Sequence, residues 1–238
     1  MRLWDLANAG SVRAFATLSR YIAERIERAY GRDALVIYPP VDTGFFTPDG
    51  TPREDFYVTA SRFVPYKRVD LIAAAFRTMP RRRLVIIGDG PDAVKVRAAA
   101  GPNVEMVGRL SRREVRAYLR RARAFVFAAE EDFGIAPVEA QACGTPVIAF
   151  GKGGVTETIC GLDSPAPTGV FYAEQTAESL SAAIVRFEAL RPGIRGGACT
   201  ENALRFRAEL FRKQFLAFVR REHDKMGPEG VEPSHVGL

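Results

Sequence analysis

Short apolar segments that alternate with helix-like segments are the feature that most limits the fold of this chain. The apolar segments are continuous rather than alternating with polar residues, which indicates strands buried on both faces. Helices would then form the crossovers between parallel strands. We therefore expect an α/β fold with a doubly wound parallel sheet. The expected strands span residues 35–38, 56–60, 83–87, 103–107, 124–128, 147–150 and 169–172, and the expected helices 20–30, 69–78, 92–100, 112–123, 135–142, 155–160, 176–190 and 199–223.

The composition is that of an ordinary globular protein, with 47% apolar and 26% charged residues. No apolar run approaches the roughly 20 residues of a membrane span, and the first residues lack the basic and apolar regions of a signal peptide. The three cysteines show no metal-ligand spacing, which favours reduced thiols. We expect a cytoplasmic protein, with peripheral contact at the inner face of the membrane as an alternative.

The net charge of +6 arises largely from basic clusters at 81–83, 111–116 and 120–123. Such clusters favour solvated helix faces. A phosphate-bearing ligand and an anionic membrane surface are the functional alternatives. A nucleic acid partner is not expected, because aromatic residues are not interleaved with the basic residues as stacking platforms.

The loop sequence SRFVPYKR, residues 61–68, lies between an expected strand and an expected helix. Arg62 and Lys67 are five positions apart and can converge on one anion. A guanidinium can grip a phosphate with two parallel hydrogen bonds, while an ammonium acts as a point charge. From spacing alone, two solvated basic residues remain an equal alternative.

The stretch EDFGIAPVEAQACGTPVI, residues 131–148, places two carboxylates around the start of an expected helix. Gly134 lies near that start, where free backbone N–H groups and the helix dipole favour an anion. Glu131 and Glu139 are suited to accept hydrogen bonds from sugar or ribose hydroxyls. The structural alternatives are dipole stabilisation for Glu131 and an ordinary surface acid for Glu139.

Other glycine-containing turns carry weaker signals. Gly88-Asp89-Gly90-Pro91 is most often a tight turn, and residues 151–154 do not complete a phosphate-binding loop. The histidines, His223 and His235, lie near the C-terminal end, so no Ser-His-Asp arrangement is expected within the domain. The absence of a DxD pair or a His/Cys cluster argues against a protein-bound metal, and we expect no cofactor.

Taken together, several segments resemble the nucleotide-sugar-binding half of the family 4 retaining glycosyltransferases. They are SRFVPYKRVDLIAAAF, LVIIGDGP, NVEMVGRL and EEDFGIAPVEAQACGTPVIAFGKGGVTETI, in this order. The resemblance covers roughly residues 12–220, and its most specific part is a Glu-x7-Glu motif formed by Glu131 and Glu139. The segments SRFVPYKRVD and EEDFGIAPVEAQA are most similar to mannosyltransferase-type members, which implies GDP-mannose as the favoured donor. It also implies the C-terminal, Rossmann-like half of a GT-B fold.

The resemblance implies a role for each matching residue. Arg62 and Lys67 correspond to the basic pair on the donor diphosphate, Glu131 to the acid on the transferred sugar, and Glu139 to the acid on the ribose. With Arg62 and Lys67, Glu131 is expected to carry the catalytic role. The backbone amides of Phe133, Gly134 and Ile135 would meet the sugar and phosphates, and Val107, Gly108, Arg109 and Leu110 would cradle the base.

The resemblance further implies retaining, metal-independent hexosyl transfer to a glycan or lipid-linked acceptor. The acceptor-binding domain of such enzymes is not recognised in this chain, so we expect an incomplete enzyme. Residues 1–33 would be a remnant of that domain or a linker, 34–223 the donor domain, and 224–238 a disordered tail. Two alternatives stay open: a fragment of a nucleotide-sugar epimerase, and a non-catalytic nucleotide-binding or interaction module.

Overall fold

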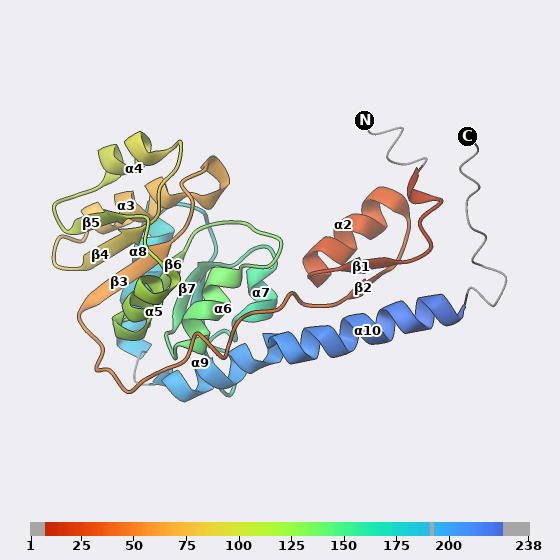
Figure 1. Ribbon diagram of the computed structural model, residues 1–238. Helices are drawn as coiled ribbons and strands as arrows, with labels where there is room; N and C mark the ends of the chain where they lie inside the picture. The colour runs from red at the N-terminus through yellow and green to blue at the C-terminus, as the bar shows by residue number, and fades with distance from the viewer. Residues whose placement is uncertain (1–7, 191–192, 226–238) are drawn as a thin grey trace. The chain divides into compact units, whose positions relative to one another are not determined.

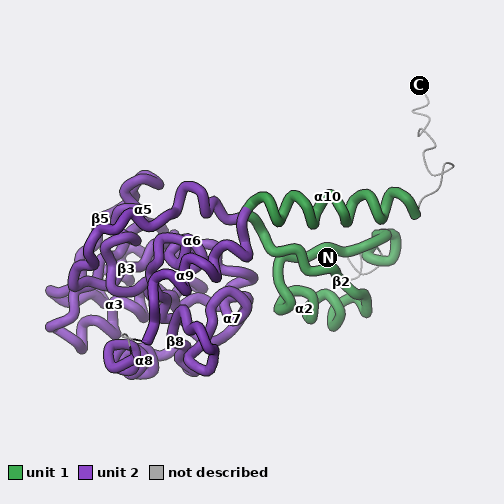
Figure 2. Tube along the Cα trace, turned by 90° about the horizontal axis from the view of Figure 1, so that it is seen from below, with its two compact units in different colours: residues 1–40, 208–238 green, residues 41–207 purple. Residues whose placement is uncertain are grey.

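A computed structural model describes residues 8–190 and 193–225 of the chain. The chain divides into two compact units (Figure 2). The central unit comprises residues 41–207, and the terminal unit comprises residues 1–40 and 208–238. The division lies at 40/41 and 207/208, whereas the expected donor domain spans 34–223. The functional assignment of each part stays a prediction, and the expected tail lies almost wholly outside the described residues.

The central unit contains a six-stranded sheet with the order β5-β4-β3-β6-β7-β8. All five strand pairs are parallel. This arrangement confirms the expected doubly wound α/β fold, because the chain moves outward from β3 in one direction and then returns to build the other side. The strands are β3 (Phe56–Ala60), β4 (Arg83–Ile87), β5 (Val104–Gly108), β6 (Phe125–Phe127), β7 (Val147–Phe150) and β8 (Gly169–Tyr172).

Helices cover both faces of this sheet (Figure 1). Helices α3, α4 and α8 form one layer, and α5, α6 and α9 the other. The helices are α3 (Val69–Arg77), α4 (Ala93–Ala99), α5 (Arg112–Arg121), α6 (Ile135–Ala142), α7 (Val155–Thr158), α8 (Ala177–Leu190) and α9 (Gly196–Ala203).

The central strands are buried on both faces, as their continuous apolar sequences predicted. Val85, Ile86 and Val126 are completely inaccessible to solvent. Successive residues of a strand point to opposite faces, so both layers of helices must contribute to the core. Truncating a buried isoleucine such as Ile86 to alanine typically destabilises a protein by about 2–5 kcal/mol. The sheet is therefore a rigid platform for the loops at its edges.

The terminal unit combines the two ends of the described chain. Strands β1 (Phe15–Thr17) and β2 (Ala34–Val36) pair in parallel around α2 (Arg20–Tyr30). Ser19 caps α2, and Gly31 ends it in the left-handed conformation that favours glycine. Helix α10 (Ala208–Asp224) belongs to the same unit, where the Arg13 guanidinium donates to the Lys225 carbonyl at 2.8 Å.

The basic helix α5 is held against residues 42–54 of the central unit. Its start is stabilised by a capping box, in which Ser111 and Glu114 bind each other's backbone N–H. Four arginines then face carbonyl or carboxylate oxygens: Arg112 pairs with Asp42, Arg116 and Arg120 donate to the carbonyls of Phe45 and Thr47, and Arg121 pairs with Glu54. These contacts favour the structural interpretation of this cluster over a membrane-binding one.

One expected helix, 199–223, is divided in the structure. Helix α9 ends at Ala203, a 3₁₀ turn spans Leu204–Phe206, and Arg207 is extended before α10 begins. Phe206 is buried, and its carbonyl accepts a hydrogen bond from the Val41 amide at 2.8 Å instead of from the helix. Neither proline nor glycine marks this break, so tertiary contacts overrode a continuous helical pattern.

Among the described residues, no helix has the length and apolar character needed to cross a membrane. The described cysteines are free thiols: Cys143 and Cys199 are buried, and Cys160 is half-buried.

Candidate functional site

The strand order places a topological switch between β3 and β6. From β3 the chain proceeds outward to β4 and β5, whereas β6, β7 and β8 lie on its other side. The loops after β3 and β6 therefore diverge from adjacent strands at the carboxyl edge. Ligands of open parallel sheets bind in the crevice formed at such a point. These two loops carry Lys67 and Glu131.

Lys67 and Glu131 form an ion pair between the Lys67 Nζ and a Glu131 Oε atom. Their side chains are only 19% and 15% exposed. Burial lowers the pKa of Lys67 to about 8, and the ion pair opposes this shift because it favours the charged ammonium. The structure thus joins two candidate residues that are distant in the sequence.

Arg62 lies on the same β3–α3 loop as Lys67 but differs from it in exposure and contacts. It is exposed, and no hydrogen bond or ion pair of its guanidinium to another described residue is found. Its five N–H donors are therefore available to a ligand. Together with Lys67, it supplies two positive charges from one loop.

Two glycines hold this loop in place. A Cβ on Gly88 would lie 1.8 Å from the Ser61 carbonyl oxygen, and one on Gly90 would lie 2.4 Å from the Phe63 carbonyl oxygen. The Asp92 amide also donates to the Phe63 carbonyl at 3.1 Å. Any larger residue would push the two loops apart, so the Gly88-Asp89-Gly90 turn supports the Arg62 loop.

The Glu131 loop is held in a similar way by the glycines of residues 151–154. The Gly154 amide donates to the Glu131 carbonyl at 2.8 Å. Cβ atoms on Gly153 and Gly154 would come within 2.5 Å of the Glu131 and 2.2 Å of the Asp132 carbonyl oxygens. The close approach that these glycines permit is therefore to the chain's own backbone.

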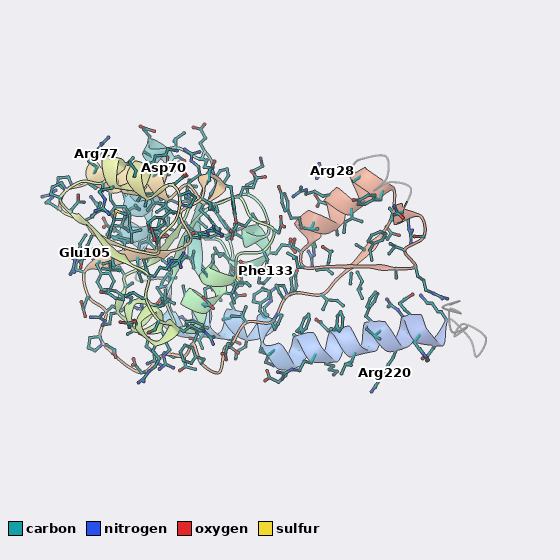
Figure 3. All side chains as sticks on the ribbon, turned by 45° about the horizontal axis from the view of Figure 1, so that its top comes forward. Arg28, Asp70, Arg77, Glu105, Phe133 and Arg220 are labelled. Carbon is teal, nitrogen blue, oxygen red and sulfur yellow. The ribbon has the colours of Figure 1, made fainter. Side chains whose placement is uncertain are left out.

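Helix α6 begins directly after this loop, at the same edge. Gly134 precedes it with φ 89°, a left-handed conformation that favours glycine, and no side chain caps the helix. The amides of Ile135 and Ala136 consequently have no intrahelical acceptor and can donate to an anion, whereas Pro137 has no N–H. Phe133, labelled in Figure 3, is buried and packs edge-on against Phe206, with ring centroids 5.4 Å apart, whereas Ile135 is 47% exposed.

Glu139 lies one turn further along α6 and is half-buried. Burial raises the pKa of its carboxyl group to about 7. Arg112 acts in the opposite direction, and Asp42 adds to the rise. Near neutral pH the group exists in both protonation states. Glu139 is therefore not an ordinary solvated surface acid.

Val107 to Leu110 lie at the end of β5, the edge strand of the sheet. The Gly108 carbonyl accepts a hydrogen bond from the Gly88 amide at 2.8 Å, which joins this segment to the loop after β4. Gly108 itself has φ 73°. Residues 107–110 thus share the carboxyl edge with the Lys67–Glu131 pair, with the Gly88 turn between them.

Sequence reasoning missed three participants in this arrangement. Asp42 and Arg112 lie far from Glu139 in the sequence, and both shift the pKa of its carboxyl group. Arg68 adopts φ 49° and ψ 38°, a left-handed conformation that costs a non-glycine residue roughly 1–2 kcal/mol. The residue letters alone gave no signal for any of these, because each depends on the tertiary fold.

Comparison with known proteins identifies the family. The family model described as glycosyl transferases group 1 matches residues 47–204, more than half of the chain. The chain belongs to this family. The family match contains the Lys67 loop, the Glu131 loop and helix α6.

Curated relatives of this glycosyltransferase chain include two mannosyltransferases. The GDP-mannose-dependent monoacylated alpha-(1-6)-phosphatidylinositol monomannoside mannosyltransferase of Corynebacterium glutamicum is 32% identical over 199 residues, which cover 71% of this chain and 51% of the relative. The GDP-mannose-dependent alpha-(1-6)-phosphatidylinositol monomannoside mannosyltransferase of Mycobacterium tuberculosis is 31% identical over 172 residues, with 60% and 45% covered. The chain thus spans about half the length of these relatives.

Solved structures agree on the fold. Sucrose-phosphate synthase from Thermosynechococcus elongatus matches with a TM-score of 0.81 and 24% identity, covering 94% of this chain and 62% of that one. Anabaena Alr3699/HepE, solved in complex with UDP and glucose, matches with a TM-score of 0.74 and 19% identity, covering 92% and 66%. These likenesses confirm the expected Rossmann-like half of a GT-B glycosyltransferase fold.

Among the described residues, no group of three or more His, Cys, Asp or Glu side chains could hold a metal ion.

Proposed function

We propose that the central unit binds the nucleoside-diphosphate sugar of a retaining hexosyltransferase, with GDP-mannose the favoured donor. The observation that carries the proposal is the Lys67–Glu131 pair at the switch between β3 and β6, beside the open start of α6. Cationic and hydroxyl-binding groups are thereby combined at one edge of the sheet. A diphosphate linked to a sugar requires that combination.

Each group has a part in this proposal. Arg62 and Lys67 bind the diphosphate, and the amides of Phe133, Gly134 and Ile135 meet the sugar and phosphates. Glu131 accepts hydrogen bonds from the transferred sugar and Glu139 from the ribose. The base lies against residues 107–110.

The chemistry follows from charge. When the glycosidic bond breaks, the leaving diphosphate gains negative charge. Lys67, Arg62 and the α6 amides are preorganised to stabilise that charge, so the chain's own groups serve this purpose without a metal ion. Lys67 exchanges the Glu131 carboxylate for the diphosphate, and Glu131 is released to orient the sugar.

Transfer also requires an acceptor. We propose a glycan or lipid-linked hydroxyl that attacks the sugar on the face from which the diphosphate leaves, which retains the configuration. The departing phosphate oxygen takes the hydroxyl proton. The acceptor-binding groups lie in a further domain, so we expect the chain alone to bind donor and to transfer sugar poorly.

Calorimetric titration with GDP, UDP, GDP-mannose and UDP-glucose tests the proposal. We expect at least one nucleotide to bind, and GDP-mannose to bind more tightly than UDP-glucose. Lys67→Ala should weaken this binding. Lys152→Ala is its matched control, because Lys152 pairs with Glu130 at the same edge of the sheet but is 60% exposed. Failure of every nucleotide to bind would refute the donor-site assignment. Tighter binding of UDP-glucose would refute only the choice of GDP-mannose.

A further inference from the structure

Arg68 follows Lys67 directly and has an unusual backbone. It is the one non-glycine residue with positive φ in the part of the chain that the structure describes. It joins the 3₁₀ turn Pro65–Lys67 to α3, with its amide bonded to the Pro65 carbonyl and its own carbonyl accepting from the Leu71 amide. Glycine would adopt this conformation without steric cost. The presence of arginine therefore directs attention to what its side chain contacts.

The Arg68 side chain begins a chain of hydrogen bonds across the carboxyl edge of the sheet. Its Nη1 donates to the Gln175 Oε1 at 3.1 Å, and the Gln175 Nε2 donates to the Ala128 carbonyl at 2.7 Å. Asp70, on the first turn of α3 (Figure 3), lies 3.6 Å from the Arg68 Nε and supports the guanidinium. The contacts thus join the loops after β3 and β8 to the end of β6.

This bridge connects the same two segments as the Lys67–Glu131 ion pair. At one end Arg68 is the neighbour of Lys67, and at the other Ala128 lies three residues before Glu131. In the donor site proposed above, Lys67 leaves Glu131 to bind the diphosphate. The ion pair then no longer fixes the distance between the two segments, whereas the Arg68–Gln175–Ala128 bridge uses neither Lys67 nor Glu131.

We propose that Arg68 is a positioning residue for donor binding: its bridge through Gln175 holds Lys67 in reach of the diphosphate after the ion pair with Glu131 is exchanged. The inference rests on the proposed donor site. On this proposal the contacts of the Arg68 side chain, rather than its strained backbone, explain why arginine occupies this position.

Two substitutions break the bridge at different points. Arg68→Gly removes the side chain and relieves the left-handed strain, so the unfolding temperature should stay unchanged or rise. Gln175→Ala leaves the Arg68 charge in place and removes both hydrogen bonds. Arg186→Ala is a control that removes one positive charge from an exposed position of α8.

The readout is the affinity gain of GDP over guanosine and of UDP over uridine, measured by calorimetry alongside thermal unfolding. If Arg68 positions Lys67, its loss should weaken binding of the diphosphate and leave binding of the nucleoside unchanged. We expect Arg68→Gly and Gln175→Ala each to reduce this gain about tenfold, the effect of losing one charged hydrogen bond. The double variant should lose no more than either single one, and Arg186→Ala should match the wild type.

Different results separate the possible failures. If the wild-type chain binds no nucleotide, the proposed donor site is wrong, and this inference fails with it. If the wild type binds but Arg68→Gly keeps the full gain, the positioning role alone is wrong. If Arg68→Gly weakens the gain and Gln175→Ala does not, Arg68 contacts the phosphate directly and the bridge is overturned. A parallel loss of nucleoside affinity and unfolding temperature would indicate a merely structural role.

Discussion

Two basic regions of the central unit, helix α5 and the β3–α3 loop, look alike in the sequence and differ in the structure. Four of the five α5 arginines face carbonyl or carboxylate oxygens of residues 42–54 and hold that segment in place. In the loop, Arg62 is exposed, and Lys67 is held by one carboxylate that belongs to another candidate residue. The number and kind of partners, rather than charge itself, decide which basic residues are available to a ligand.

The largest effect is expected from Lys67→Ala. The variant loses a charged hydrogen bond to the diphosphate, so the affinity for nucleoside diphosphates should fall by about 10–100-fold, or roughly 1.5–3 kcal/mol. Calorimetry with GDP and UDP measures the change, and Lys152→Ala provides the comparison. Equal affinities for wild type and Lys67→Ala would remove the distinction between the loop and α5.

Arg120→Ala tests the other region and should have the opposite profile. Its side chain is 15% exposed and donates to the Thr47 carbonyl and the Asp49 carboxylate. Leaving these acceptors unpaired should lower the free energy of unfolding by about 1–3 kcal/mol in a denaturant titration, with nucleotide affinity unchanged. Arg113→Ala, at an exposed position of the same helix, should stay within about 0.5 kcal/mol of the wild type. A loss of nucleotide binding in Arg120→Ala with full stability would contradict the structural role.

The contrast also explains what the sequence could and could not predict. Continuous apolar runs predicted the parallel sheet, because burial on both faces is a local property of each strand. The candidate residues follow strands in the sequence, and the carboxyl ends of parallel strands lie at one edge of the sheet. Sheet order is not encoded locally, so only the family resemblance, and no local pattern of residues, indicated that the loops bearing Lys67 and Glu131 would be neighbours. The left-handed Arg68 and the break before α10 depend on tertiary contacts in the same way.

A smaller effect is expected from pH, and it links the two regions through Glu139. Burial raises the pKa of Glu139 to about 7, and in the proposed donor site the ionised carboxylate is a stronger acceptor for the two ribose hydroxyls than the neutral acid. Affinity for a sugar nucleotide should therefore rise up to about tenfold from pH 6 to pH 7.5. Since burial lowers the pKa of Lys67 to about 8, affinity should fall again above that pH as the ammonium loses its proton.

Calorimetry with GDP-mannose and UDP-glucose between pH 6 and 8.5 measures this profile, and the linked sugar keeps the charge of the diphosphate constant. Glu139→Gln should abolish the acidic limb. Arg112→Ala should move that limb to higher pH, because Arg112 lowers the pKa of Glu139 and Asp42 raises it. A flat profile in the wild type would show that neither group titrates in contact with the ligand.

The smallest expected effect comes from Glu131→Gln, and its sign is the informative part. Glu131 pairs with Lys67, so in the proposed donor site its carboxylate competes with the diphosphate for that ammonium. Its neutral replacement should therefore bind GDP or UDP about threefold more tightly, a change of roughly 0.6 kcal/mol in binding free energy. In the same variant, the affinity that the linked sugar adds in GDP-mannose over GDP, or in UDP-glucose over UDP, should fall. A neutral amide makes weaker hydrogen bonds to hydroxyls than a carboxylate does. Glu130→Gln, whose partner Lys152 is exposed, should change neither quantity. Weaker diphosphate binding in Glu131→Gln would mean that Glu131 keeps Lys67 in place rather than competing for it, and Lys67 would then resemble the α5 arginines more than Arg62.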